Sequence, residues 1–469
     1  MMPALALLAA LAAPQDTVTT QLRPYVRVAA PAIALTHANV IVGTDAPARP
    51  NQTIIIRGGR VERVGDDGAV PVPPDAQTLD LTGRAVLPGF VMVHEHLFYP
   101  AGQGQYNWLG YSFPRLYLAG GATTIRTGGS MVPYADLNLK RGIDAGQTPG
   151  PDLDVTGPYL NGPGLPIAAV NALRDSAHAR RMVEYWADEG ATSFKVYMQI
   201  TRDELAAVVA AAHRRGLKVT GHLCSVTYRE AADLGIDDLE HGLYASTDFV
   251  TAKEPDRCPM GAAQSLTGLG VNGPQVTDLI HHLVERHVAL TSTLTVFETS
   301  VPGRPRAPDR VLDAMAPEVR DLYLRRFAQI ATDSGASAAD ARRRFANAMA
   351  FERAFARAGG LLLAGTDPTG YGGVVAGYAN QREIELLVEA GFTPVEAIKI
   401  ATLNGATYLG RQDRIGTIAP GKQADLVVVR GDPAARIADI ENVELVFKHG
   451  IGYDPARLIE AARGLVGLR

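Results

Sequence analysis

Short hydrophobic runs broken by glycine, proline and aspartate fill the chain from about residue 33 to residue 87. The runs are rich in valine and isoleucine, which is typical of β-strands. The same pattern returns after residue 414, in the runs 424–429 and 443–447. We expect both ends of the chain to pair into one small β-sandwich.

Between these ends, strand-like and helix-like segments alternate. The strand candidates number eight and lie at residues 85–96, 122–128, 152–158, 192–198, 218–223, 238–242, 288–297 and 360–367. Eight strands alternating with helices predict an α/β fold, a (β/α)8 TIM-like barrel, with its active site at the C-terminal ends of the strands. The predicted organisation is a signal peptide and tail at 1–26, a composite β-sandwich domain with the C-terminal tail at 27–84 plus 411–469, and a barrel at 85–410.

Several helices carry clear start and stop signals. Thr201 and Glu204 have the spacing of a capping box, and the apolar stripe that follows ends near Gly216. Thr393, Pro394 and Glu396 combine an N-cap, a proline in the first turn and a capping glutamate. We expect a helix from there towards residue 409.

Composition excludes some classes of protein. With 46% apolar residues, 20% charged residues and a formal net charge of −4 over 469 residues, the chain reads as an ordinary globular protein. It lacks the basic surface that nucleic acid requires, so nucleic acid is not an expected partner. Two cysteines, Cys224 and Cys258, exclude a disulfide scaffold, and the sequence does not show whether they are bonded.

The first 13 residues have the hydrophobic length and the Ala-x-Ala ending of a secretory signal, although the first basic residue is Arg23. This pattern predicts a periplasmic or secreted protein; the alternative is a cytoplasmic protein with an apolar N-terminus. No later run reaches the roughly 20 apolar residues of a membrane helix, so we expect no membrane span.

Candidate metal ligands stand at the ends of the predicted barrel strands. His94 and His96 close the first strand one residue apart, so both project to the same face. Other strands end in Lys195, His222, His241 and Asp367. A lysine inside an apolar strand is costly unless it is paired or chemically changed, and carbamylation would turn it into an anionic ligand. Five strand ends of this kind predict a metal site.

These residues resemble the amidohydrolase superfamily, in the branch of imidazolonepropionase-like enzymes, Xaa-Pro dipeptidases (prolidases) and ochratoxinase-like amidases. The resemblance runs from about residue 33 to residue 465. Besides the ligands, it includes Leu-Pro-Gly-Phe at 87–90, Thr-Pro-Val-Glu-Ala-Ile at 393–398, Ala-Thr-Leu-Asn-Gly-Ala at 401–406 and Gly-Thr-Ile-Ala-Pro-Gly-Lys-Gln-Ala-Asp-Leu at 416–426.

The resemblance implies two divalent metal ions, which by ligand chemistry are most simply zinc, with manganese, cobalt or iron as alternatives. It implies that His94, His96 and Asp367 hold one ion and that His222 and His241 hold the other. Lys195, carboxylated on Nζ, would bridge them. A water bridging the two ions would become the nucleophile, and Asp367 would pass its proton to the leaving amine.

Two further residues are candidates for contacts with substrate. Tyr197 shares strand-face parity with Lys195, so it is a candidate to donate a hydrogen bond to the substrate oxygen; the alternative is a packed barrel tyrosine. Arg126, at the end of the second strand, is a candidate to hold a substrate carboxylate. The loop after the first strand also carries an aromatic cluster suited to an apolar group: Phe98, Tyr99, Tyr106, Trp108, Tyr111 and Phe113.

Three features depart from the family pattern or from a plain barrel. Glu95, between the two histidines, should point away from the metals, where we expect it to form a structural ion pair. Cys224, two residues after His222, is either a packed residue or an additional ligand, and we favour packing. The segment 298–359 is long for a connection and is a candidate lid.

The favoured function is metal-dependent hydrolysis of a linear amide in a small molecule, such as an Xaa-Pro dipeptide or an N-acyl amino acid. The alternative is hydrolysis of a cyclic amide, lactone or ester on the same binuclear centre. A deaminase is disfavoured because superfamily deaminases carry a glutamate shortly after the strand-five histidine, where this chain reads Leu223-Cys224-Ser225. A non-catalytic scaffold is least favoured because all six ligands are present. The oligomeric state, a homo-oligomer included, stays open.

Overall fold

The computed structural model describes residues 18–469 except 103, 166, 168 and 171. The hydrophobic N-terminal stretch for which we predict an export signal therefore lies outside the described residues.

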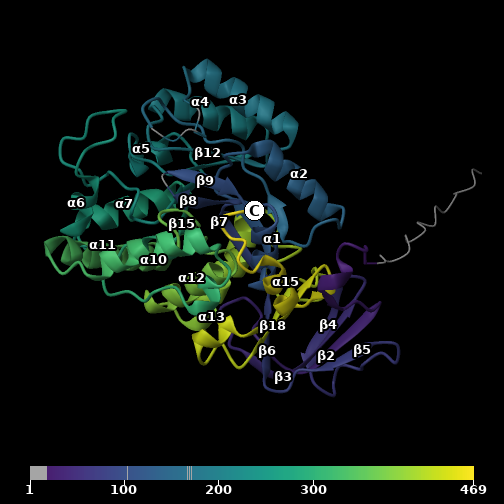
Figure 1. Cartoon of the computed structure of the whole chain (residues 1–469). Coiled ribbons are helices and arrows are strands. Elements are labelled where there is room, and N and C mark those ends of the chain that lie inside the picture. The colour runs from purple at the N-terminus through teal and green to yellow at the C-terminus, as the bar shows by residue number, and fades with distance from the viewer. Residues whose placement is uncertain (1–17, 103, 166, 168, 171) are drawn as a thin grey trace, which may run out of the picture.

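Eight parallel strands form the centre of the molecule (Figure 1). They are β7 (Phe90–Glu95), β10 (Ala122–Thr127), β11 (Asp152–Asp154), β12 (Ser193–Val196), β13 (Lys218–Gly221), β14 (Asp238–Glu240), β15 (Ala289–Ser292) and β16 (Leu362–Ala364). The strands pair in the orders β11-β10-β7 and β12-β13-β14-β15-β16. A parallel bridge between Thr156 and Ser193 closes one gap, and the Thr366 N–H, which donates to His94 O at 3.0 Å, closes the other. The predicted barrel is confirmed.

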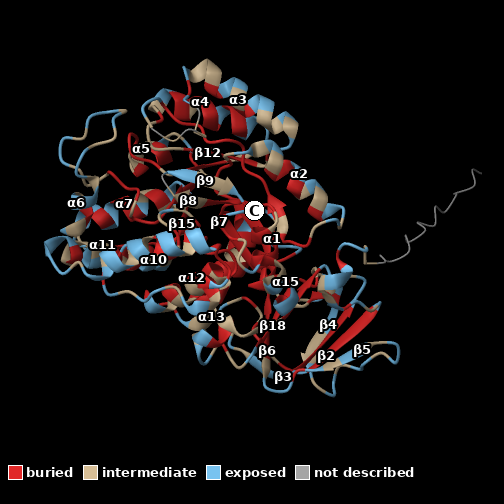
Figure 2. Ribbon diagram, viewed as in Figure 1, coloured by how far each residue is buried: buried red, intermediate tan, exposed pale blue. Residues whose placement is uncertain are grey.

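Helices surround these strands and turn their hydrophobic faces inward. The larger ones are α1 (Ser112–Ala119), α2 (Pro133–Asp144), α3 (Ser176–Glu189), α4 (Arg202–Arg214), α7 (Pro274–Glu285), α10 (Pro317–Ala331), α11 (Ala336–Arg357), α12 (Tyr378–Glu389) and α15 (Pro455–Ala462). Shorter helices are α5 (Tyr228–Asp233), α6 (Ala262–Thr267), α8 (Leu294–Glu298), α9 (Asp309–Leu312), α13 (Pro394–Lys399) and α14 (Gly405–Tyr408). Buried residues concentrate in the strands and on the inner sides of the helices (Figure 2).

Both ends of the chain build one nine-stranded sheet beside the barrel. From the N-terminal end come β1 (Val26–Val28), β2 (Ala32–Val40), β3 (Arg49–Arg57), β4 (Arg60–Asp66), β5 (Gln77–Asp80) and β6 (Arg84–Pro88); from the C-terminal end come β17 (Leu426–Arg430), β18 (Val443–Lys448) and β19 (Ile451–Tyr453). The N-terminal strands pair with the C-terminal ones through β6 and β17 and through β1 and β19. The expected β-rich unit from both termini is therefore present, and all nine strands belong to one continuous sheet.

The sheet passes directly into the barrel at Gly89, which separates β6 from β7. A Cβ at Gly89 would lie 2.1 Å from the Thr123 hydroxyl oxygen, so only glycine allows this close approach. The Gly89 N–H donates to Asp425 O at 2.8 Å. The single strand expected at 85–96 is thus two strands, one in each unit.

The seventh barrel strand is shorter than expected, because β15 ends at Ser292 and α8 begins at Leu294. The Glu383 carboxylate, on α12, accepts the backbone N–H groups of Leu294 and Thr295 at 3.2 and 3.0 Å. It thereby caps a helix that β-branched residues alone would not favour. This cap comes from a distant segment, so the local pattern could not reveal it.

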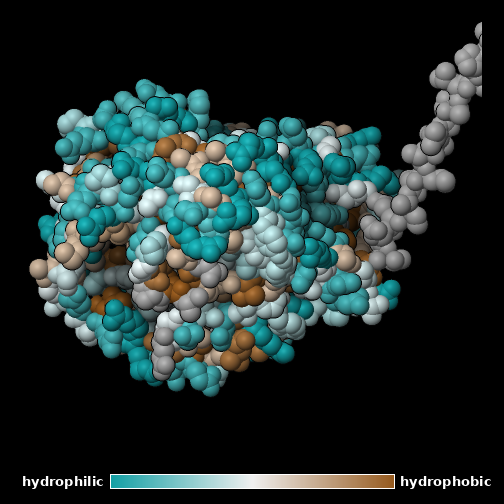
Figure 3. All heavy atoms as spheres, turned by 90° about the horizontal axis from the view of Figure 1, so that it is seen from above, coloured by the Kyte–Doolittle hydropathy of each residue, from teal (hydrophilic) through white to brown (hydrophobic). Residues whose placement is uncertain are grey.

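None of the helices formed by the described residues combines the length and the hydrophobicity that crossing a membrane requires. The face of the molecule seen in Figure 3 is largely hydrophilic, with hydrophobic residues set in hollows between polar ones.

Candidate metal centre

The six predicted ligands converge on one cavity of about 250 Å³. His94 lies on β7 and His96 follows it, and Lys195 lies on β12. His222 and His241 directly follow β13 and β14, and Asp367 lies three residues after the end of β16. The predicted strand ends therefore meet at one rim of the barrel, as parallel strands require. Two of the ligands, His241 and Asp367, have positive φ angles of 72° and 49°. Such strain in residues other than glycine is concentrated at functional sites.

Asp367 lies among the histidines. Its Oδ1 is 3.0 Å from His96 Nε2 and 3.8 Å from His94 Nε2, and its Oδ2 is 3.8 Å from His241 Nδ1. One ligand atom each from His94, His241 and Asp367 lies within 4.8 Å of the other two. The His222 and His241 rings are 4.5 Å apart. Ligand atoms this close to one another are those that a shared cation would draw together.

The chemistry of these side chains fits divalent cations. Both ring nitrogens of His94 and Nδ1 of His96 are buried without a hydrogen-bond partner among the described residues. Burial lowers the pKa of all four imidazoles, that of His222 to about 3, so each ring is neutral and keeps a lone pair. Burial alone would raise the pKa of Asp367, but the hydrogen bond with His96 and the nearby His241 and Lys195 lower it, so this carboxylate is ionised. Neutral imidazoles with a carboxylate suit zinc and its neighbours.

Lys195 lies at the bottom of the cavity, 1% exposed, with its Nζ in contact with the Glu240 carboxylate. Burial lowers the pKa of Lys195 to about 7, although the Asp367 and Asp238 carboxylates favour the ammonium form. Glu240 is fully buried and also accepts a hydrogen bond from the Thr220 hydroxyl at 2.7 Å. Sequence analysis did not assign Glu240 a role; the signal was a second acidic residue at the end of the sixth strand, beside His241.

Arg126 does not contact the cavity, so its expected role as a carboxylate anchor is corrected. Its guanidinium lies inside the barrel, where it donates to the Ser193 hydroxyl at 2.9 Å, the Thr220 hydroxyl at 2.8 Å and Val93 O at 2.8 Å. The side chain is 1% exposed. Its strand position was read correctly, but the side chain points below the metal ligands and cross-links the strands.

Tyr197 lines the cavity, as expected for a residue on the face of Lys195. Its ring lies 4.9 Å from that of His222 and 5.1 Å from that of Tyr159. Burial raises the pKa of Tyr197, so its hydroxyl keeps its proton and remains a donor.

Of the expected aromatic cluster after the first strand, two rings reach the cavity, namely Phe98 and Tyr106. They come from the hairpin of β8 (Phe98–Gly102) and β9 (Gln105–Trp108). Tyr99 and Phe113 are fully buried in the core instead. Trp108 donates to Asp136 at 2.8 Å, and Tyr111 packs against the Arg115 guanidinium. Sequence reasoning also missed Phe297, which lies on α8 just before the 298–359 segment and lines the cavity.

Glu95 points away from the metal ligands, as strand alternation predicts, but the expected ion pair is wrong. Its carboxyl accepts hydrogen bonds from the Thr366 hydroxyl and, at 2.7 Å, from the Asn380 amide. No lysine, arginine or histidine within the described residues forms an ion pair with it. Burial raises the pKa of Glu95 to about 8, so neutral partners suffice.

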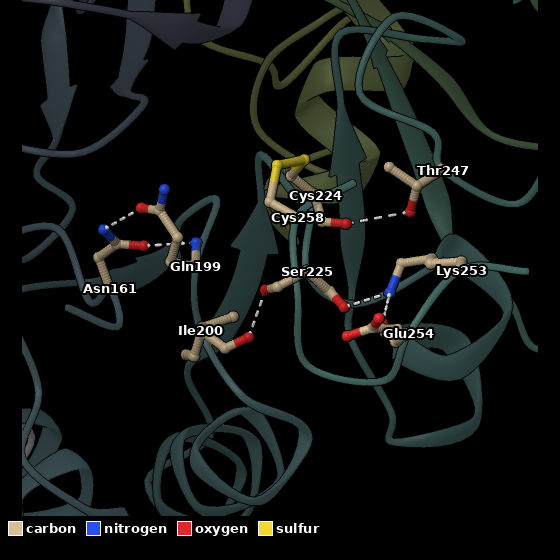
Figure 4. The surroundings of a disulfide bond; sticks show 9 residues. All are labelled: Asn161, Gln199, Ile200, Cys224, Ser225, Thr247, Lys253, Glu254 and Cys258. Atoms are coloured by element: carbon tan, nitrogen blue, oxygen red, sulfur yellow. Dashed lines mark hydrogen bonds between the residues drawn. A yellow bond between two sulfur atoms is a disulfide. The ribbon is translucent and has the colours of Figure 1, made fainter. Parts of the chain in front are cut away.

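Cys224 forms a disulfide with Cys258, 34 residues away, which corrects both alternatives weighed for it. A disulfide sulfur carries no thiolate, so Cys224 is not a metal ligand. Figure 4 shows the bond beside the loop after β14, where Lys253 donates to Ser225 O at 2.5 Å and Thr247 donates to Cys224 O at 3.1 Å. The disulfide thus fastens this loop two residues from His222.

Solved structures of other proteins share this architecture. A putative prolidase from Bifidobacterium longum has a TM-score of 0.65 and 26% identity, over 90% of this chain and 94% of that one. A bottromycin amidohydrolase has a TM-score of 0.70 and 22% identity, over 96% of this chain and 95% of that one.

Curated relatives match over short stretches. An imidazolonepropionase from Porphyromonas gingivalis is 55% identical over 40 residues, which is 8% of this chain and 10% of that protein. The chain likewise spans about a tenth of the adenine deaminases it matches, 11% in that of Ligilactobacillus salivarius. Residues 85–451 as a whole match the amidohydrolase family. Because this match covers most of the chain and includes all six candidate ligands, the protein belongs to the amidohydrolase family.

Proposed function

We propose that this protein, a hydrolase of carbon–nitrogen bonds, cleaves a linear amide bond in a small molecule at a binuclear metal centre. Xaa-Pro dipeptides and N-acyl amino acids are the initial candidate classes. The observation that supports this best is the convergence of four neutral imidazoles, an ionised carboxylate and a buried lysine on one cavity.

The residues divide between two ions in the way the family resemblance implies. His94, His96 and Asp367 would hold one ion, His222 and His241 the other, and carboxylated Lys195 would join them. When bound, divalent ions of this kind lower the pKa of a water molecule and polarise the substrate carbonyl. The ions proposed are zinc, with manganese, cobalt or iron as alternatives.

Carboxylation of Lys195 is supported by its environment. A pKa of about 7 leaves a large share of this amine neutral at neutral pH. The neutral nitrogen adds to the carbon of CO₂, a nitrogen–carbon bond forms, and one proton leaves. Glu240, in contact with Nζ, is placed to take up this proton.

Two side chains are placed to act on the substrate. The Asp367 carboxylate, central among the ligands, is the group we propose to take a proton from the attacking water and deliver it to the leaving amine nitrogen. The Tyr197 hydroxyl, which stays protonated, would donate a hydrogen bond to the carbonyl oxygen as negative charge develops there.

A library experiment tests this function. The protein is produced with zinc and bicarbonate and incubated with dipeptides, N-acyl amino acids, N-acyl amides, lactones and cyclic amides, and mass spectrometry records which bonds open. Metal content is measured in parallel, and the Lys195→Ala variant serves as the blank. New free amines absent from the blank support the linear-amide function.

Opened rings without released amines would instead favour the cyclic-amide or lactone alternative. A wild-type protein that holds no metal and opens no bond would contradict the proposal altogether.

We also propose that the protein is exported, to the periplasm or beyond. The signal-like pattern of residues 1–13 and the Cys224–Cys258 disulfide both support an oxidising compartment. Fractionation of cells that express the full chain tests this, and full-length protein confined to the cytoplasm would contradict it.

A further inference from the structure

The metal cavity has walls without positive charge. Apart from the ligands and Tyr197, the wall nearest the site includes Met131, Tyr159, Ile167, Val170, Val296 and Phe297. Phe297 stacks on Tyr244 with ring centroids 3.7 Å apart, which holds this wall in place. Such a surface favours apolar or aromatic groups on either side of a scissile bond.

Among the described residues that line the cavity, Lys195 is the one lysine or arginine. It lies at the bottom among the metal ligands, in contact with Glu240. Arg126, the nearby guanidinium, is committed to three hydrogen bonds inside the barrel and does not line the cavity. Among the described wall residues, no side-chain cation is therefore left to pair with a carboxylate next to the scissile amide, and the proposed metal ions would be occupied by their ligands, the attacking water and the scissile carbonyl.

The polar side chains in the wall other than the candidate ligands are neutral, and two of them donate hydrogen bonds to other groups of the protein. The Thr369 hydroxyl donates to Asp367 Oδ1 at 3.0 Å, and the Thr299 hydroxyl donates to Val296 O at 2.7 Å. A carboxylate that enters this cavity loses water and gains no countercharge from the wall. Removing a charge from water without pairing it is among the larger penalties in protein chemistry.

We infer that the substrate carries no free carboxylate beside the amide that is cleaved. The substrate class is an N-acyl amide or an end-blocked peptide, uncharged and with apolar or aromatic groups on both sides of the bond. This inference rests on the proposed amide-hydrolase function and revises its initial candidate classes, because dipeptides and N-acyl amino acids, which carry a free carboxylate beside the amide, become poor substrates.

The inference concerns positions next to the scissile bond. A neighbouring cavity of about 270 Å³ shares Tyr106 and Gly370 with the site and has Arg326 in its wall. A negative group far from the amide therefore has a cation within that second cavity, and substrates that extend into it are compatible with the inference.

A matched pair of compounds tests it. Phenylacetyl-phenylalanine and phenylacetyl-phenylalaninamide have nearly the same shape and differ by one negative charge beside the amide. Release of phenylacetate is followed by liquid chromatography and mass spectrometry with the zinc-loaded full-length protein. We expect kcat/KM to be at least about tenfold higher for the carboxamide. Equal or faster cleavage of the carboxylate overturns the inference and leaves the amide-hydrolase function standing.

Binding separates failure of the inference from failure of the function. Equilibrium dialysis measures the dissociation constant of each compound for the same zinc-loaded protein. If neither is cleaved, the pair gives no support to the function, but tighter binding of the carboxamide still supports the uncharged class. Equal or tighter binding of the carboxylate overturns it.

A variant pair isolates charge from shape. Met131 is half-buried in the wall, and Met131→Lys adds an ammonium on an unbranched stem of similar length, whereas Met131→Gln adds polarity alone. We expect Met131→Lys to shift the ratio of the two kcat/KM values, or of the two affinities, towards the carboxylate by about tenfold relative to Met131→Gln. The same ratio in both variants would show that charge does not set the preference, and would overturn the inference.

Discussion

Single residues at the metal centre have distinct expected roles, and Tyr197 allows the sharpest test. Its hydroxyl lies in the cavity wall and stays protonated. If it donates to the developing oxyanion, Tyr197→Phe should lower kcat by about 10²-fold with little change in KM. Steady-state kinetics on the best amide found in the library measure this.

Tyr159→Phe is the matched control for that experiment, because Tyr159 lines the same cavity and its ring lies 5.1 Å from that of Tyr197. We expect the control to keep most of its kcat. If the two variants lose activity to the same extent, the effect belongs to the wall as a whole and the specific role of Tyr197 is wrong.

Residue positions were predictable from strand parity, but their partners were not. Alternation along β7 placed His94 and His96 on one face and Glu95 on the other, as the structure shows. It could not show that Glu95 meets Thr366 and Asn380 rather than a cation. Strand alternation also does not show how far along the barrel axis a side chain lies. For this reason the Arg126 side chain was expected at the rim of the barrel, although it lies inside the barrel below the rim.

At the scale of elements, the disulfide between Cys224 and Cys258 holds the loop after β14 against the end of β13. Closing a loop of 34 residues removes chain entropy worth about 3–4 kcal/mol from the unfolded loop. We therefore expect that reduction of this disulfide by a thiol reductant accelerates tryptic cleavage at Lys253 and Arg257, both inside this loop, by several fold. Mass spectrometry of timed digests, with and without reductant, measures the effect.

The double variant Cys224→Ser/Cys258→Ser is the control for that digest. It should be cut at the fast rate in both conditions, since it has no bond to lose. Wild-type protein that is cut equally fast before and after reduction would show that the hydrogen bonds of Lys253 and Thr247, and not the disulfide, hold the loop.

Elements themselves followed from sequence where their signals are local. The capping boxes at Thr201 and Thr393 form as predicted. Local signals failed where a distant group decides the element. Glu383 ends β15 by capping α8, and the contact of Gly89 with Thr123 divides the first predicted strand in two.

At the scale of the whole molecule, the sheet built from both chain ends is coupled to the barrel that carries the ligands. Strand β6 passes through Gly89 into β7, and the turn between β18 and β19 meets β11 from the barrel. At that contact Asp152 pairs with the nearly buried Lys448 at 2.8 Å and with His449 at 3.0 Å. The cluster of Asp152, Lys448 and His449 therefore offers a direct test of how strongly the sheet and the barrel stabilise each other.

The cluster predicts how stability depends on pH. The hydrogen bond with Asp152 raises the pKa of His449, so that stabilisation is complete below about 6.5 and is lost as pH rises through the higher folded value. Burial would raise the pKa of Asp152, but His449 and Lys448 together lower it, so its contribution is complete above about 3.8 and is lost as pH falls. Stabilisation from the cluster is therefore greatest between about pH 4 and 6.5.

Asp152→Asn should remove this stabilisation, by about 1–3 kcal/mol within that range and by less on either side. The measurement is the difference in urea midpoint between wild type and variant, taken across pH with metal content matched. His449→Gln is the control that separates the contribution of His449 from that of Asp152. Because this variant removes only the histidine, its difference in urea midpoint from wild type should disappear as pH rises above the folded pKa of His449. A difference for Asp152→Asn that stays constant from acid to alkaline pH would mean that the contact stabilises the molecule by packing rather than by charge. The contact between sheet and barrel would then tolerate substitution of Asp152 by uncharged residues of similar size.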